Sequence, residues 1–259
     1  MAYVKCLRGI KGSEIPEGST ATPTDVVETL LNCAGIFDKE YTTIAQLLAD
    51  TTSLNTVITS NNAIDYLVRS TTFASAVTAD QTAMSYIGLN NYASNTLLAD
   101  STWCSAICNS TYFESVLNVK VPTMTSNTTP SGVCFASSEN SGNEAYKGFD
   151  KNNSTYFATA SNISSGAFLG YGFTESKHIY CCSILPFNNS RDKVVNVEKS
   201  SDNITYNAVI SNQTIYWNGI EQKIIFDDSA RYWRLYEVSS ADVDRFAIYE
   251  LQFYGRADV

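Results

Sequence analysis

Oxygen-bearing side chains cluster in a polar turn at residues 145–156. Within it, Asp150, Asn152 and Thr155 place three such side chains inside six positions. Calcium and similar cations take roughly six to eight oxygen ligands, and a tight turn presents several at once. Such a turn usually borrows a distant carboxylate, which Glu250 can supply. These residues predict a calcium site. The alternative is a metal-free surface turn, because Asn, Asp and Gly favour turns in any case.

Residues suited to catalysis are sparse. The single histidine, His178, lies in a strand-like run, and no Gly-x-Ser-x-Gly elbow or phosphate-binding loop occurs. The pair Asp242 and Asp244 has the pattern of a solvated turn. The seven cysteines form no paired framework, and one histidine gives a zinc site little support. We therefore expect a non-enzymatic protein with buried free thiols.

The charge balance argues against two classes of partner. The chain has 26 Asp and Glu against 17 Lys and Arg, with no basic stripe to replace counterions on phosphates. We therefore expect neither nucleic acid nor an anionic membrane as a partner. The N-terminus lacks the apolar core of a signal peptide, and no run approaches the roughly eighteen apolar residues of a membrane span. This predicts synthesis in the cytoplasm without export.

Residues 40–119 contain an internal repeat of ten residues, whose first position is Glu, Asp, Asn or Ser. The eighth position is always aliphatic: Leu47, Val57, Leu67, Val77, Ile87, Leu97, Ile107 and Leu117. In one continuous helix this position would rotate by about 80° per unit, so no common face would form. A helix that stops and restarts at each N-cap residue fits the pattern, and such short helices must stack on one another. The alternative is a Ser- and Thr-rich linker.

The chain is expected to divide into three segments. Residues 1–39 predict an attachment segment with one short helix, or alternatively a frayed tail. Residues 40–120 form the short-helix array, which one chain alone is not expected to cover, so we predict a homo-oligomer with a trimer favoured. Residues 121–259 contain short aromatic and β-branched runs divided by polar turns, typical of a β-sandwich. The predicted fold class is α+β multidomain.

Four ordered motifs in the last segment carry a resemblance to a known family. They are Ala145-x-x-x-Phe149-Asp150 with Thr155-Tyr156, Ser200-Ser201-Asp202-Asn203-x-x-Tyr206, Ala230-Arg231-Tyr232-Trp233-Arg234-Leu235 and Ile248-Tyr249-Glu250-Leu251-Gln252-Phe253-Tyr254-Gly255. In this order they resemble the discoidin family, the galactose-binding-like domains that include coagulation factor C domains and family 32 carbohydrate-binding modules. The resemblance implies a jelly-roll sandwich that holds ligands in loops at one end.

The resemblance also implies a set of calcium ligands. These fall on Lys147 (carbonyl), Asp150, Asn152, Thr155, Tyr249 (carbonyl) and Glu250. Two positions depart from the family pattern, since Lys151 stands where Gly is usual and Tyr156-Phe157 where Trp is usual. The disulfide that joins the domain ends in the coagulation members has no counterpart here.

A carbohydrate site would combine an aromatic side chain, which stacks on a pyranose, with amide or guanidinium groups that bind its hydroxyls. The candidates on presumed loops are Tyr156, Phe157, Asn188, Asn189, Arg191, Tyr216 and Trp217. Each also fits a structural role, and the resemblance does not choose among them.

Arrays of short Ser-, Thr- and Ala-rich units that lead into a discoidin-like module resemble, in architecture, bacteriophage head- and tail-fibre proteins. This implies a non-enzymatic protein of the virion surface, whose partners are other virion proteins and host or mucosal glycans. The alternative is a capsid or tail decoration protein with no glycan ligand. An accessory module of a bacterial glycosidase is disfavoured, because no catalytic domain accompanies it.

Overall fold

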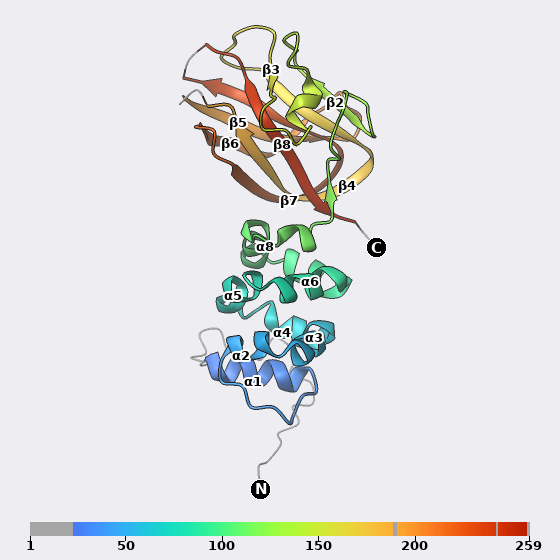
Figure 1. Cartoon of the computed structure of the whole chain (residues 1–259), viewed down its shortest axis with the longest axis vertical. Coiled ribbons are helices and arrows are strands. Elements are labelled where there is room, and N and C mark those ends of the chain that lie inside the picture. The colour runs from blue at the N-terminus through green and yellow to red at the C-terminus, as the bar shows by residue number, and fades with distance from the viewer. Residues whose placement is uncertain (1–22, 189–190, 242, 258–259) are drawn as a thin grey trace. The chain divides into compact units, whose positions relative to one another are not determined.

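The computed structural model divides the chain into two compact units, Met1–Val116 and Leu117–Val259. It describes residues 23–188, 191–241 and 243–257, so most of the expected attachment segment lies outside the described residues. The first unit is helical and the second is an antiparallel β domain (Figure 1). No described helix is long and apolar enough to cross a membrane.

The helical unit is a series of short helices that restart after polar caps. Asp50, Ser60, Asp80, Asn90 and Asp100 each accept hydrogen bonds from backbone N–H groups of the helix that follows. These five residues hold the first position of their ten-residue units. The elements are α1 (Pro23–Cys33), α2 (Ile44–Ala49), α3 (Thr51–Thr59), α4 (Asn61–Leu67), η1 (Thr71–Phe73), α5 (Ala74–Thr78), α6 (Gln81–Leu89), α7 (Asn91–Leu98), α8 (Ser101–Asn109) and η2 (Phe113–Ser115).

The first five α-helices of this unit each pack against the helix three places further along the chain. Contacts join α1 to α4, α2 to α5, α3 to α6, α4 to α7 and α5 to α8, and Figure 1 shows the helices stacked in layers. Three helices therefore complete one turn of the array. Hydrogen bonds span the same interval: the Ser60 hydroxyl donates to the Cys33 carbonyl at 3.1 Å, and the Ser110 hydroxyl donates to the Thr78 carbonyl at 2.5 Å.

This stacking covers the apolar positions of the repeat within one chain. All eight aliphatic positions, from Leu47 to Leu117, are at most 3% exposed. The premise of the predicted trimer, that a single array leaves these positions uncovered, is therefore wrong. Self-association stays a prediction, now without that support.

The β unit is built from antiparallel strands. Its elements are β1 (Val119–Lys120), β2 (Val133–Ala136), η3 (Ala145–Gly148), β3 (Phe157–Ala158), β4 (Phe168–Pro186), β5 (Arg191–Ser200), β6 (Asn207–Trp217), β7 (Gln222–Ser240) and β8 (Ala247–Arg256). The strand order is β1-β8-β4-β7-β5-β6, with β2 added to β4 and β3 added to β8. This large antiparallel sheet agrees with the predicted β-sandwich class.

Strands β4 and β7, 19 residues each, fold the sheet over on itself. Residues 168–172 of β4 pair with β2 and with the end of β7, whereas residues 177–184 pair with β8 and with the start of β7. A register shift lies between the two halves, as expected where a strand bends. The halves enclose one core, in which Trp217, Trp233 and Phe253 are fully buried.

Replacing Leu97 by Ala should destabilise the helical unit by about 2–5 kcal/mol, because it removes buried methyl groups and leaves a cavity. Leu89 is the matched control: it is 84% exposed, against 0% for Leu97, so Leu89→Ala should change stability by less than about 0.5 kcal/mol. Urea unfolding followed by helical circular dichroism measures both changes. Equal effects of the two substitutions would contradict the stacked arrangement.

Candidate functional site

The polar turn at residues 145–156 closes against β8. Asp150 Oδ1 accepts a hydrogen bond from the Asn152 amide at 2.9 Å, and Asp150 Oδ2 accepts one from the Thr155 hydroxyl at 2.7 Å. The Asn152 amide also donates to Glu250 Oε1 at 2.8 Å, across 98 positions of sequence. The turn therefore brings together the side chains of Asp150, Thr155 and Glu250 around the Asn152 backbone amide, whereas the Asn152 side-chain oxygen accepts a hydrogen bond from the Ser154 amide at 3.1 Å.

Lys151 has a backbone φ of 56°, in the left-handed region that favours glycine. It follows Asp150 directly, at the position where the discoidin resemblance expects Gly. The hydrogen bonds on either side of Lys151 hold the turn in this conformation. Lys151 therefore differs from the family pattern in residue type but adopts the backbone conformation that Gly would have at this position.

The two carboxylates of this turn interact unfavourably. Burial, the Asp150 charge and a side-chain hydrogen bond to Asp150 raise the pKa of Glu250 to about 8. A cation between them would relieve the repulsion. The described residues contain no group of three or more His, Cys, Asp or Glu side chains that could hold a metal. An ion here would therefore take two carboxylates and neutral oxygens, a donor set that suits calcium better than zinc.

The two predicted carbonyl ligands come from the turn itself and from β8. Lys147 is in η3, where its ammonium pairs with Glu144 at 3.4 Å. Tyr249 lies at a register shift between β4 and β8, and a bulge of this kind takes a residue out of regular strand pairing.

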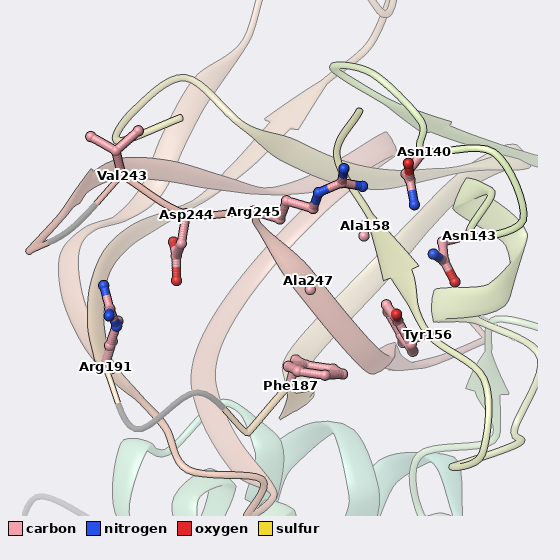
Figure 2. A pocket seen from close by; sticks show the side chains of 10 residues that line it. All are labelled: Asn140, Asn143, Tyr156, Ala158, Phe187, Arg191, Val243, Asp244, Arg245 and Ala247. Atoms are coloured by element: carbon pink, nitrogen blue, oxygen red, sulfur yellow. The ribbon is translucent and has the colours of Figure 1, made fainter. Parts of the chain in front are cut away.

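An open pocket of about 620 Å³ lies beside the turn (Figure 2). We call it the Tyr156 pocket. Its lining residues come from the loops before β3 and β8, from β3 itself and from the facing ends of β4, β5 and β8. They are Asn140, Asn143, Tyr156, Ala158, Phe187, Arg191, Val243, Asp244, Arg245 and Ala247.

Aromatic rings form one wall of the Tyr156 pocket. The Tyr156 ring packs on Phe187 with centroids 4.8 Å apart, and its edge meets Tyr249 at 5.9 Å. Phe187 stacks on Tyr249 at 5.1 Å. Because Tyr156 follows Thr155 and Tyr249 precedes Glu250, the aromatic wall and the candidate cation turn share the same two backbone segments.

Polar side chains surround this wall. Figure 2 shows Arg245 pointing toward Asn140 across one side of the pocket, with Asn143 near Tyr156 and with Arg191 and Asp244 on the far side. The pocket thus combines amide and guanidinium donors with an aromatic surface. That combination can bind hydroxyl-rich ligands.

A buried lysine forms an ion pair with Asp244 on the core side of the pocket. Lys193 is 0% exposed, and its ammonium contacts Asp244 Oδ1 at 2.6 Å, Glu237 Oε1 at 2.7 Å and the Ser240 hydroxyl at 3.2 Å. The ammonium also lies 5.6 Å from the centroid of the Trp217 ring. Burial raises the pKa of Glu237, and its other oxygen, Oε2, is buried without a hydrogen-bond partner.

The structure brings together only part of the predicted sugar-binding set. Tyr156 and Arg191 both line the Tyr156 pocket. Asn188 is exposed beyond the end of β4, and Asn189 lies outside the described residues. Tyr216 is 57% exposed on β6 and does not line this pocket.

Trp217 is wrong as a sugar-stacking residue. It is 0% exposed, and its indole N–H donates to the Ala247 carbonyl at 2.8 Å. Neighbouring residues of a strand face opposite sides of the sheet, so an exposed Tyr216 requires an inward Trp217. Phe157 is also fully buried, so it offers no surface to a ligand.

Sequence reasoning missed several residues of the pocket. Asn140, Asn143 and Phe187 carried no motif, and Arg245 adjoins a segment interpreted as a solvated turn. Asp244 is instead bonded to buried Lys193. The adjacent acidic and basic residues at 244 and 245 were the available signal in the sequence, but only the folded chain shows that they line the same pocket as Tyr156.

No family model matches the sequence, and no curated protein matches it. Among solved structures, CBM32 of AlyQ in complex with 4,5-unsaturated mannuronic acid is 22% identical with a TM-score of 0.42, and the alignment covers 47% of this chain and 92% of that one. The family 32 CBM from C. perfringens NanJ in complex with galactose is 16% identical with a TM-score of 0.43, covering 52% and 99%. Chitosan-binding module 2 from a Paenibacillus sp. IK-5 chitosanase/glucanase, in complex with chitotriose, is 20% identical with a TM-score of 0.42, covering 48% and 96%. All three TM-scores lie below 0.5, so the ligand of this chain must be argued from its own side chains.

Without calcium, the stability of the β unit should fall as pH rises from about 5 to about 8. The folded-state pKa of Glu250 is raised from 4.5 to about 8, so in this window the folded protein keeps a proton that the unfolded chain has released. Stability is therefore highest near the lower pH and is lost as pH passes the folded pKa.

Urea unfolding in the presence of a chelator, repeated across this pH range, measures how the free energy of unfolding changes with pH. Glu250→Gln should flatten it, because the amide oxygen can still accept from Asn152 and no longer titrates. Glu175→Gln is the control, since Lys177 lowers the pKa of Glu175 and places its titration below the window. A slope that persists in Glu250→Gln would contradict the assignment.

Proposed function

We propose that the β unit is a non-catalytic carbohydrate-binding module of the discoidin-like class, with its sugar held in the Tyr156 pocket. One observation carries the proposal: a half-buried aromatic wall, formed by Tyr156 and Phe187, lines one open volume together with amide and guanidinium groups. Aromatic C–H stacking suits the apolar face of a pyranose, and Asn140, Asn143 and Arg245 can bind its hydroxyls.

The size and openness of the Tyr156 pocket fit a short part of a glycan. Its volume of about 620 Å³ lies within the roughly 300–1,000 Å³ range of ligand pockets. A shallow polar site gains little beyond its desolvation and ordering costs, so we expect dissociation constants of roughly 0.1–1 mM per site. Several copies displayed together would turn this weak affinity into useful avidity.

The proposal includes a structural calcium ion in the 145–156 turn. Its ligands would be the side chains of Asp150, Asn152, Thr155 and Glu250, together with the carbonyls of Lys147 and Tyr249. The repulsion between Asp150 and Glu250 supports a cation at this place. By tying the turn to β8, the ion would also fix the position of Tyr156 at the pocket.

Calcium should raise the melting temperature of the wild-type β unit, because a ligand that binds only the folded state stabilises it. At a hundredfold excess over its dissociation constant the gain is about 2.7 kcal/mol. Asp150→Asn should abolish the gain. Asp202→Asn should keep it, because Asp202 caps a different turn through Ile204 and Thr205. Differential scanning calorimetry with calcium and with chelator tests this, and identical wild-type curves would remove the metal from the proposal.

Tyr156→Ala should abolish retention of the protein on densely displayed glycans that bind the wild type. Tyr216→Ala is the matched control, because this tyrosine is exposed on the same unit and lies outside the pocket lining. A multivalent display of the full chain on a glycan array measures retention, and melting curves identify any loss of folding. Loss of binding in Tyr216→Ala with retention in Tyr156→Ala would place the sugar elsewhere.

We further propose that the whole chain is a surface protein of a bacteriophage virion, of the fibre or decoration type. The support is the sequence resemblance in architecture, a ten-residue helical array that leads into a binding module. Electron microscopy of particles labelled with an antibody to this chain tests it, and labelling confined to host material would contradict it. If particles are labelled but no glycan binds, the alternative of a decoration protein without a glycan ligand is favoured.

A further inference from the structure

A second open pocket lies at the opposite end of β5 from the Tyr156 pocket. Arg191, at the start of β5, lines the Tyr156 pocket, whereas Lys199 and Ser200, at its end, line the second one. The positions from Arg191 to Lys199 span roughly 25 Å of extended strand. The second pocket has a volume of about 540 Å³, and we call it the Ser200 pocket. Its lining residues are Ser176, Lys199, Ser200, Ser201, Thr205, Asn207, Ser229, Ala230 and Arg231.

The lining of the Ser200 pocket is polar. Two of the four ordered sequence motifs, at residues 200–206 and 230–235, contribute to it, and neither contributes to the Tyr156 pocket. Among the described residues, no aromatic and no acidic side chain lines it. A sugar therefore finds no ring to stack on here, so recognition in this pocket is by hydrogen bonds and charge. Exposed hydroxyl and amide groups come from Ser176, Ser201, Thr205, Asn207 and Ser229.

Arg231 is an exposed residue whose guanidinium is held at one edge. Its Nε atom donates to the Phe173 carbonyl at 3.0 Å, and its guanidinium carbon lies 5.0 Å from the centroid of the Tyr232 ring. A guanidinium has several N–H donors in a rigid fork, so the two terminal amino groups are not used by the bond from Nε. These groups match two oxygens of an oxyanion through parallel hydrogen bonds.

The two basic residues of the lining differ in how their charges are compensated. The Lys199 ammonium pairs with the Asp228 carboxylate. Arg231, in contrast, forms no ion pair with a residue that the structure describes, and its contacts are those with Phe173 and Tyr232. One uncompensated positive charge suits a ligand group that carries one negative charge.

Two acidic residues adjoin the Ser200 pocket in sequence without lining it. Asp202 Oδ1 accepts hydrogen bonds from two backbone amides of its own turn, each at 2.9 Å. Glu175 pairs with Lys177 at 2.6 Å. Both carboxylates are therefore engaged outside the lining, which leaves the Arg231 guanidinium as the charged group that an entering ligand meets.

We infer that the Ser200 pocket is a second binding site of the β unit, for a singly charged tetrahedral oxyanion carried on a glycan or polyol polymer. Arg231 binds two oxygens of the anion, and the hydroxyls of Ser201 and Ser229 are available to the others. Two groups have this chemistry, the sulfate monoester and the phosphodiester. The inference goes beyond the proposed function and does not require a sugar in the Tyr156 pocket.

Surface plasmon resonance of the full chain on two matched pairs of immobilised polymers tests the inference. One pair is dextran sulfate and dextran, and the other is poly(glycerol phosphate) and polyglycerol. In at least one pair the anionic polymer should bind at least about tenfold more tightly, the contribution of one charge-assisted hydrogen-bonded pair. Because the formal net charge of the chain is −9, non-specific attraction to a polyanion is unfavourable. The pair that shows the difference identifies the source of the oxyanion, and added salt should reduce it.

Arg231→Gln should remove the preference for the anionic polymer. Arg69→Gln is the matched control, because it removes the same charge from an exposed position of the helical unit and should leave the preference intact. If Arg231→Gln does not fold, as judged by its melting curve, Ser201→Asp serves instead, since it places a like charge in the lining. Its control is Ser211→Asp, at an exposed position of β6 outside the lining.

The outcomes separate this inference from the proposed function. Equal binding of anionic and neutral polymers in both pairs would overturn the inference, as would a preference that survives Arg231→Gln and Ser201→Asp. A preference abolished by Tyr156→Ala would place the anion in the other pocket and also overturn it. If no neutral glycan binds but the preference is present and depends on Arg231, the proposed function fails and the inference stands.

Discussion

The contact between the 145–156 turn and β8 is the constraint on which the candidate site depends. One backbone amide, that of Asn152, is shared between Asp150 and Glu250, so two carboxylates are held close together. Their repulsion and burial oppose ionisation of Glu250, which disfavours this geometry at neutral pH unless a proton or a cation is present. Tyr156 and Tyr249 of the aromatic wall lie on the same two segments. The position of the wall therefore depends on how the charge of the Asp150 and Glu250 carboxylates is balanced.

The helical unit follows a different principle, in which no single contact dominates. Each helix has too few residues to be stable alone, and its stability comes from a polar cap at one end and apolar positions on the packed side. Because most helices contact the next one, and α1 to α5 each contact the one three places on, the units contribute the same kind of burial. Removal of one unit would therefore break contacts above and below it.

The parts of the structure that follow from local sequence could be predicted, and the parts that follow from strand pairing could not. The caps at Asp80 and Asp100 and the buried position of Leu97 are periodic features, visible within ten residues. The 150–155 turn is also local. In contrast, the inward direction of Trp217 depends on which face of β6 meets the core, and Arg245 lines the same pocket as Tyr156 only because β3 pairs with β8. The premise of the predicted trimer, that the apolar positions are left uncovered, was wrong because contacts between helices three places apart leave no pattern beyond the repeat itself.

A charged residue, Lys193, occupies a core position on β5 and contacts the loop that carries Arg245. Lys193 alternates with Val195 and Val197 on the inner side of β5, where an apolar residue would avoid the cost of burying a charge. The lysine is instead satisfied by Glu237 and Ser240 of β7 and by Asp244 of the loop before β8. An apolar replacement could fill the same space, but it could not fix the loop through a directed bond. Since Asp244 and Arg245 both line the Tyr156 pocket, the buried charge ties the loop before β8, and with it one side of the pocket, to the core of the β unit.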